Sequence, residues 1–392
     1  METARSGRAV RPGALARRIE LNKQTSGQVL GFPWRGACLL AAFVLGGCAG
    51  GPGAGGGWKQ VTPPEMAGVT LSDVTASGAG FEAVGTALGA SNAQKGAAFK
   101  SADGTTWVAA ANEQFKDATL AAVAAVHQGL VALGAGHCSL ECGGFQSWLS
   151  TDGTTWGGPV KSTTPGDDAR GIGLVEEGST IVAVATELQD PSTNKNRGRV
   201  YLSTDANAWT DPLAADALAQ DIPTGIATDG TSLVAVGSTI SAEGTHNGGA
   251  WRSADGHAWS AATNDGSFEG AQLMAVVHGP GGYFAVGSIG LDGAVWSSID
   301  GASWARVDGG AFKGSPLADI AANATGYVAV GRGANGGAAW TSTDGKSWRT
   351  SGTIQGSEGA KFVAVAIGTT ASMIVGGPMG SSAGMVWVGP LP

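Results

Sequence analysis

One short motif recurs along this chain at intervals that suit a single small β-sheet. The motif reads S-x-D-G-x-x-W; five copies are complete, and a sixth has Ala206 in place of its glycine. An earlier tryptophan stands at the same interval without a preceding motif. The seven tryptophans of this column are Trp58, Trp107, Trp156, Trp209, Trp259, Trp304 and Trp348, spaced 44 to 53 residues apart. Self-similarity at such a period indicates a repeat architecture.

Each period also contains short β-type segments at constant positions. An aromatic residue stands two places before each motif, an apolar run such as Leu233–Gly237 lies upstream, and another such as Leu273–Val277 precedes that. Four runs of four to eight residues, separated by glycine and aspartate, predict one four-stranded antiparallel sheet. Seven of these units predict an all-β fold, a seven-bladed β-propeller.

The two ends of the repeat array complement each other. Residues 58–61 form a strand with no unit of their own, whereas the last unit stops after its third strand at Trp387. We therefore expect the N-terminal strand to complete the last blade, which leaves the closed ring with only short edges. The predicted propeller spans residues 58–390.

The repeated motif resembles the Asp-box of the BNR (bacterial neuraminidase) or sialidase-type repeat. That repeat is found in sialidases, xyloglucanases, sortilin-type receptors and photosystem assembly factors. The resemblance covers about residues 58 to 390, and the motif of this chain lacks one residue between its aspartate and glycine. It implies blade architecture and says little about function.

The repeated aspartates are predicted to fasten the turn between the third and fourth strands. An Asp-Gly pair is a strong hairpin signal, because glycine accepts positive φ and aspartate bonds nearby amides. These aspartates are Asp103, Asp152, Asp205, Asp255, Asp300 and Asp344. Turns at the blade periphery cannot bring six carboxylates together on one substrate, so we expect a structural role.

The tryptophan column is predicted to pack between blades, since each indole can bury a large apolar area. Stacking of a carbohydrate on one or two of these rings is the alternative. Tyr283 and Tyr327 occupy equivalent second-strand positions and are expected in the core.

Residues 1–47 differ in composition from the remainder. They carry a net charge of +5, whereas the rest of the chain carries −13, and the short apolar run Ala37–Leu45 follows Arg35. A basic segment, a short apolar stretch and small residues predict a secretory signal. The run, at roughly ten residues, is too short for a membrane-spanning helix.

The segment Leu45–Cys48 resembles the lipobox of bacterial lipoproteins. The resemblance implies a diacylglycerol on Cys48, which becomes the new N-terminus, and residues 48–57 then serve as a glycine-rich tether. Ala49 in place of aspartate favours the outer membrane or cell surface. An ordinary signal peptide with a chance cysteine is the alternative, and a translation start near Val29 or Leu30 also remains open.

Two further cysteines, Cys138 and Cys142, stay in the exported chain. In an oxidising compartment they predict a disulfide. A metal site that includes His137 is the alternative, but no fourth ligand is apparent. We therefore predict no metal centre.

Motifs that would indicate catalysis are missing from the sequence. It has no G-x-S-x-G or H-E-x-x-H segment, and it lacks the F-R-I-P segment typical of sialidases. No tyrosine lies outside a strand column, although sialidases pair a tyrosine nucleophile with a glutamate. We predict no catalytic residues and no cofactor.

The sequence therefore favours a lipid-anchored envelope propeller that acts as a non-catalytic binding or assembly platform. Its acidic exported part excludes a nucleic-acid binder that uses a basic surface. We expect a monomer whose partner is an unidentified envelope protein or glycan. A sialidase-like protein that acts on or binds glycans is the alternative, and a pair of carboxylates facing the central channel would favour it.

Ligands are expected on the propeller face that carries the loops between second and third strands. These loops are long in the early blades. The most polar one contains Asp190, Lys195 and Arg197, which are the candidate ligand-face residues. A solvated loop without a ligand is the alternative.

Overall fold

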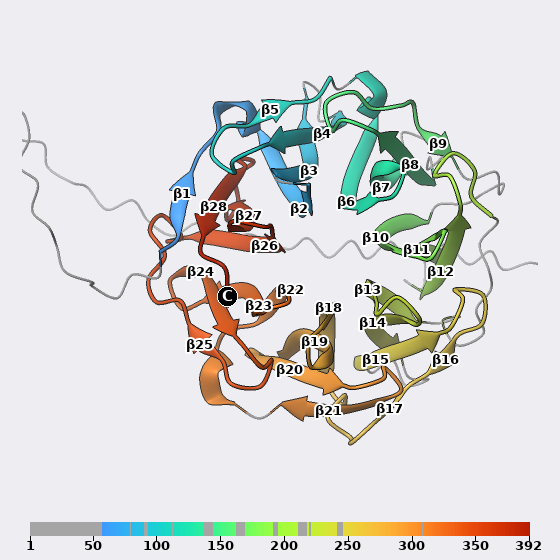
Figure 1. The fold of residues 1–392 in the computed structure, drawn as a ribbon, viewed down its shortest axis with the longest axis vertical. Coiled ribbons are helices and arrows are strands. Elements are labelled where there is room, and N and C mark those ends of the chain that lie inside the picture. The colour runs from blue at the N-terminus through green and yellow to red at the C-terminus, as the bar shows by residue number, and fades with distance from the viewer. Residues whose placement is uncertain are drawn as a thin grey trace, which may run out of the picture. The chain divides into compact units, whose positions relative to one another are not determined.

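The computed structural model describes residues 57–392 except 79, 90–92, 112, 137–143, 162–168, 191–194, 211–217, 219–220, 241–245 and 308. This part of the chain forms seven antiparallel blades in a ring around a central channel (Figure 1). The predicted all-β propeller is confirmed.

The first four blades follow chain order around the ring, and the strands of each blade run in order from the channel outwards. Blade 1 is β2 (Val69–Ser77), β3 (Gly80–Leu88), β4 (Gln94–Ser101) and β5 (Val108–Ala109). Blade 2 is β6 (Ala118–Val126), β7 (Gly129–Gly136), β8 (Phe145–Ser150) and β9 (Val160–Lys161). Blade 3 contains β10 (Arg170–Glu177), β11 (Thr180–Asp190) and β12 (Lys195–Ser203). Blade 4 is β13 (Ile222–Thr228), β14 (Leu233–Ile240), β15 (His246–Ser253) and β16 (Ser260–Ala261).

The last three blades complete the ring. Blade 5 is β18 (Ala271–Gly279), β19 (Gly282–Ile289), β20 (Asp292–Ser298) and β21 (Ser303–Val307), with β17 (Thr263–Asn264) added in parallel. Blade 6 is β22 (Leu317–Asn323), β23 (Gly326–Gly333), β24 (Gly336–Ser342) and β25 (Arg349–Thr350). Blade 7 is β26 (Ala360–Ile367), β27 (Ser372–Pro378), β28 (Met385–Gly389) and β1 (Lys59–Val61). The short 3₁₀ helices η1 (Pro64–Met66), η3 (Glu113–Phe115) and η5 (Gly310–Phe312) precede innermost strands.

The ring closes as the sequence predicts. Strand β1 lies antiparallel to β28, with Gln60 opposite Trp387. The N-terminal strand therefore supplies the outer strand of the last blade, and the two ends of the propeller are held together by a β-ladder.

The core is a ring of contacts between blades. In the described part of the chain, buried apolar side chains form seven clusters, and each cluster joins two neighbouring blades. The seven tryptophans of the repeat divide among these clusters, one to each boundary. The tryptophans pack between neighbouring blades as follows: Trp107 between blades 7 and 1, Trp156 between 1 and 2, Trp209 between 2 and 3, Trp259 between 3 and 4, Trp304 between 4 and 5, Trp348 between 5 and 6, and Trp58 between 6 and 7.

The repeated aspartates lie in the turns between the third and fourth strands. In blade 1, Asp103 Oδ1 accepts the backbone N–H groups of Thr105 and Thr106 at 2.8 and 2.7 Å. The same pair of bonds recurs at Asp152, Asp205, Asp255, Asp300 and Asp344. These bonds hold the pKa of each carboxyl below its usual range. The serine that opens each motif accepts the N–H of its fourth residue, for example Gly104 N to Ser101 Oγ at 2.8 Å.

Each innermost strand carries a β-bulge at the same place, near its start. In blade 1 the bulged residue is Ser72, and Leu71 lies opposite Gly85 of the second strand. A Cβ at position 85 would overlap the carbonyl oxygen of Thr70, so blade 1 requires glycine there. Six blades have glycine at this position, and blade 3 has Ala185.

We predict that two glycine substitutions will separate the cost of positive φ from the cost of a clash. Gly345 (φ +70°) lies in the blade 6 turn, where an added Cβ would overlap the ring of Phe284; Gly314 (φ +65°) has no atom within 4 Å of an added Cβ. Gly314→Ala should lower the free energy of unfolding by about 1 kcal/mol, and Gly345→Ala by about 3 kcal/mol. Urea unfolding measures both, and equal losses would contradict a tightly filled blade boundary.

Candidate functional site

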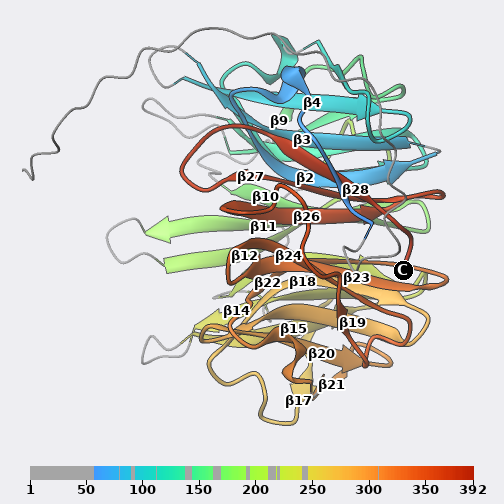
Figure 2. The ribbon, with the colours of Figure 1, turned by 90° about the vertical axis from the view of Figure 1, so that its left-hand side faces the viewer.

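The two faces of the ring differ in the connections that they carry. One face, which we call the upper face, holds the connections between second and third strands and the starts of the innermost strands. The other, the lower face, holds the Asp-Gly turns. Figure 2 shows the ring from its side, with the β11–β12 hairpin extending from the upper face.

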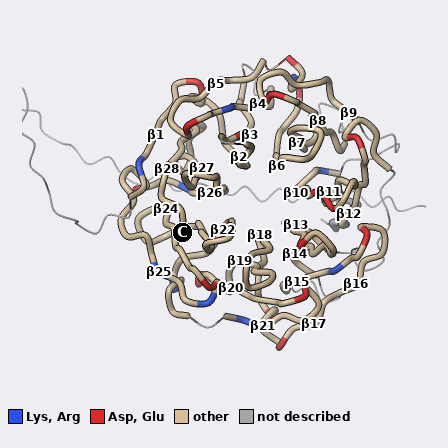
Figure 3. The backbone as a smooth tube through the Cα atoms, viewed as in Figure 1, with Lys and Arg blue, Asp and Glu red and all other residues tan. Residues whose placement is uncertain are grey.

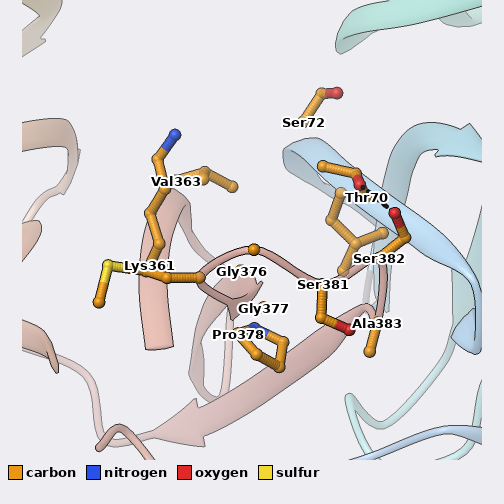
Figure 4. A pocket seen from close by; sticks show the side chains of 13 residues that line it. Thr70, Ser72, Lys361, Val363, Gly376, Gly377, Pro378, Ser381, Ser382 and Ala383 are labelled. Atoms are coloured by element: carbon orange, nitrogen blue, oxygen red, sulfur yellow. Dashed lines mark hydrogen bonds between the residues drawn. The ribbon is translucent and has the colours of Figure 1, made fainter. Parts of the chain in front are cut away.

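A cavity opens on the upper face at the boundary between blades 7 and 1. It measures about 630 Å³ and is lined by β2, β26 and the β27–β28 connection. We call it the 7–1 pocket. Its polar side chains come from opposite sides, Lys361 from β26 and Thr70 and Ser72 from β2, with Ser381 and Ser382 on the connection between them (Figure 4).

The wall of the 7–1 pocket is held in place by both blades. The backbone N–H of Met379 donates to Gly359 O at 3.0 Å within blade 7, and Gly384 N donates to Met66 O at 3.0 Å in η1. Thr70 Oγ1 also donates to Ser382 Oγ at 3.4 Å, as Figure 4 shows. The β27–β28 connection is thus tied to blade 1, so the pocket is formed before any ligand arrives.

The electrostatic character of the 7–1 pocket is set by Lys361. Its side chain is exposed, and among the described residues it has no hydrogen bond or ion pair. No acidic residue lines the pocket. Most charged positions of the described residues lie on the outer part of the ring (Figure 3). Because an ammonium group in such a setting lacks an anion, the pocket suits a ligand that carries negative charge together with apolar groups.

A second cavity of about 230 Å³ lies on the channel axis and is lined by all seven innermost strands. Every bulged residue contributes to it, and Ser72 and Val363 line both cavities. The 7–1 pocket is therefore continuous with the wall of the channel.

Two carboxylates, Asp73 and Asp319, face this channel cavity. Asp73 accepts the N–H groups of Val74 and Val123, both at 2.8 Å, and Asp319 accepts that of Val365 at 2.7 Å. Each bond to Val123 or Val365 ties one innermost strand to the next blade. The carboxylates therefore bridge blade 1 to blade 2 and blade 6 to blade 7.

Burial dominates the titration of these two groups. It raises the pKa of Asp73 to about 7 and that of Asp319 to about 8, and the charge of Asp73 adds to the rise at Asp319. The hydrogen bonds that these carboxylates accept from backbone N–H groups lower both pKa values, but by less than burial raises them. Near neutral pH the pair is thus partly protonated, a state in which a carboxyl can donate a proton as well as accept one.

The structure places the loop residues that the sequence singles out on blade 3, away from the 7–1 pocket. Asp190 and Lys195 pair in register at the end of β11 and β12, but their side chains lie outside the described residues. Arg197 lies on β12 opposite Glu187, and Glu187 forms an ion pair with Arg199 at 2.5 Å. None of these residues lines the 7–1 pocket or the cavity on the channel axis.

Several sequence predictions concern residues outside the described part of the chain. These are the signal in residues 1–47, Cys48, most of the tether, His137, Cys138 and Cys142. Within the described residues no cluster of three or more His, Cys, Asp and Glu side chains could hold a metal ion. The same part of the chain contains no helix that could cross a membrane.

Sequence reasoning did not single out Asp73, Asp319 or Lys361. A signal was present for the two aspartates, because they occupy one repeat position at which the other blades have only alanine or glycine. Those residues are Ala122, Gly173, Gly225, Ala275 and Ala364. No comparable signal marks Lys361, since the partner strands of its pocket are far apart in sequence.

Comparison with known proteins establishes the architecture. No protein-family model matches the chain, and no curated protein sequence matches it. Among solved structures it is similar to YCF48 bound to a D1 peptide, with a TM-score of 0.57 and 15% identity over 86% of this chain and 96% of that one.

Two other solved structures have comparable similarity. One is a puromycin-hydrolyzing peptidase of Mycobacterium tuberculosis, with a TM-score of 0.54 and 11% identity over 85% of this chain. The chain spans 54% of that peptidase. The other is a protein of unknown function from Dyadobacter fermentans, with a TM-score of 0.50 and 12% identity over 86% of this chain and 98% of that one. At these identities the similarity shows the propeller fold.

The channel carboxylates predict a stability that falls as pH rises. A carboxyl whose pKa is raised by folding binds its proton more tightly in the folded state, so its stabilising effect is complete below about pH 4 and is lost through about pH 8. The protein should be more stable to urea at about pH 5 than at about pH 9, by on the order of a few kcal/mol.

The double variant Asp73→Asn/Asp319→Asn should reduce this difference. It should not abolish it, because burial also raises the pKa of Glu82 to about 7. Urea unfolding followed by tryptophan fluorescence at both pH values provides the measurement. A pH dependence unchanged in the double variant would contradict the assignment.

Proposed function

We propose that this protein is a lipid-anchored propeller of the bacterial envelope that binds a segment of another envelope protein in the 7–1 pocket and does not transform it. The observation that carries the proposal is the 7–1 pocket itself, a cavity of about 630 Å³ held open by bonds from two blades, with an unpaired cation in its wall. A similar propeller, YCF48, has a peptide bound in its solved structure. This likeness supports a binding role for the same architecture.

The anchor is part of the same proposal. We assign Cys48 as the lipidated residue, residues 48–57 as the tether and the S-x-D-G-x-x-W units as Asp-box repeats. A tether lets a propeller reach a partner beside the membrane, and two or more acyl chains hold a protein stably where one is marginal.

We predict that Cys48→Ser will release the protein from the membrane fraction of a bacterial host. The replacement removes the thiol that would form the thioether to diacylglycerol, so labelling with a radioactive fatty acid should disappear at the same time. Cys138→Ser is the matched control and should keep both the label and the membrane association. Persistence of the label in Cys48→Ser would contradict the anchor.

We predict that a photo-crosslinking residue at Met379, which lines the 7–1 pocket, will capture a protein in the host envelope. The same residue at Ile299, which is 88% exposed on the lower face, should not. Lys361→Glu should weaken the captured adduct at least tenfold by reversing the pocket's charge, and Lys346→Glu on a lower-face turn should leave it unchanged. Equal capture from both faces would refute the pocket as the binding site.

A second candidate function is glycan hydrolysis, which the channel carboxylates favour. Two carboxyl groups with raised pKa values can serve as acid and base at a glycosidic bond. Both groups are, however, bonded to strand amides inside a cavity of about 230 Å³. The test is turnover of fluorogenic glycosides, sialosides included. If the unmodified protein hydrolyses one of them and Asp73→Asn does not, the protein is a glycosidase and the proposed binding role is wrong.

A further inference from the structure

One boundary between blades contains a buried carboxyl group where the repeat otherwise places an apolar side chain. Glu82 of β3 lies opposite Lys100 of β4 and is only 2% exposed. The second-strand residues at the same position of the other six blades are apolar and fully buried. They are Val131, Val182, Val234, Phe284, Val328 and Met373. A charge at this position loses the water that would solvate it, which is unfavourable.

The carboxyl group of Glu82 packs on the Asp-Gly turn of the neighbouring blade. An added Cβ on Gly153, in the turn of blade 2, would lie 2.2 Å from Glu82 Oε1. Its apolar counterparts take the same place against the turn glycine of the next blade, as Phe284 does against Gly345. Glu82 is therefore part of the contact that holds the blade 2 turn against blade 1.

The hydrogen bonding of Glu82 is incomplete. Its Oε2 atom is buried and has no hydrogen-bond partner in the described part of the chain. Its Oε1 atom is 3.7 Å from Lys100 Nζ, but that ammonium group donates its hydrogen bond to Asp152 O of the blade 2 turn, at 2.5 Å. Lys100 thus ties the two blades together and leaves the carboxyl group beside it unsatisfied. An unsatisfied neutral carboxyl group is less costly than an unsatisfied carboxylate.

Two charged groups face Glu82 and act on it in opposite directions. Lys100 on β4 favours the ionised form, whereas Asp152 on the blade 2 turn opposes it. Thr75, which is opposite Glu82 on β2, carries no charge. Burial outweighs the attraction of Lys100 and raises the pKa of Glu82 to about 7. The group therefore changes its charge near neutral pH, and the charged form is the one that this boundary accommodates poorly.

We propose that Glu82 and Lys100 form a pH-sensitive contact that holds the blade 2 turn against blade 1 when Glu82 is protonated and releases it when Glu82 is ionised. In the protonated form Lys100 stays on Asp152 O. In the ionised form the carboxylate attracts the ammonium group away from Asp152 O, and the turn moves outward so that water reaches Glu82 Oε2. The inference does not rest on the function proposed for the 7–1 pocket.

The surroundings make this release a local event. The Lys100 side chain is 41% exposed, so water is already close to the carboxyl group and a small displacement of the turn admits it. Surface turns open at a lower free energy than the core strands of a fold. Because folding raises the pKa of Glu82, the contact is stabilised at low pH and loses this stabilisation as pH rises through about 7.

The experiment is hydrogen–deuterium exchange with mass spectrometry at about pH 6 and about pH 8.5, with each rate divided by the intrinsic rate at that pH. The segment 150–156 contains the amides that donate to Ser150 and Asp152 in the blade 2 turn. Its protection should fall about tenfold between the two pH values, because the ionised form then predominates. The segment 298–304 of blade 5, whose turn glycine packs on Val234, should keep its protection.

Two variants of Glu82 remove the titrating group. Glu82→Gln keeps the shape of the side chain and does not ionise, so segment 150–156 should stay protected at both pH values. Glu82→Val introduces the residue that blades 2, 3, 4 and 6 have at this position and should act in the same way. The control Asp73→Asn/Asp319→Asn removes the channel carboxylates and should leave the release of the turn in place.

Four results would overturn the proposal. These are protection of segment 150–156 that does not change with pH, an equal loss in segments 150–156 and 298–304, a loss that persists in Glu82→Gln, and a loss that disappears in Asp73→Asn/Asp319→Asn. None of them bears on crosslinking at Met379, so failure of this contact and failure of the 7–1 pocket can be told apart.

Discussion

The structure depends on packing between neighbouring blades. Each cluster of buried apolar side chains in the described chain draws on two blades, and a tryptophan of the repeat lies in every one of them. A blade in this arrangement buries its faces only when both neighbours are present. The ring must therefore close, and the ladder between β1 and β28 closes it with the two ends of the propeller.

The bulge in each innermost strand connects this packing to the cavities. It turns one residue of every blade toward the axis, and in six blades a glycine on the second strand leaves room for the neighbouring carbonyl group. Small residues follow the bulge in five blades, whereas Asp73 and Asp319 follow it in two. Each carboxylate accepts a hydrogen bond from a backbone N–H group of the next blade, and burial raises its pKa. The same two groups therefore hold blades together and make the stability depend on pH.

Two parts of the ring depart from the repeat. In blade 7 the β27–β28 connection is tied to blade 1, and Lys361 lies there in a pocket without an anion. In blade 1 the buried carboxyl group of Glu82 takes the place of an apolar side chain against the turn of blade 2.

The primary structure alone established the blade number, the order of strands and the closure of the ring, because a regular period and hairpin signals act within short stretches of chain. It also placed the aspartates in their turns. It did not locate the 7–1 pocket, whose walls come from Thr70 and Lys361, nearly the whole propeller apart in sequence. Only the folded ring brings those strands together. In the folded ring Lys361 lines a pocket without a carboxylate, and burial raises the pKa of Asp73 and Asp319.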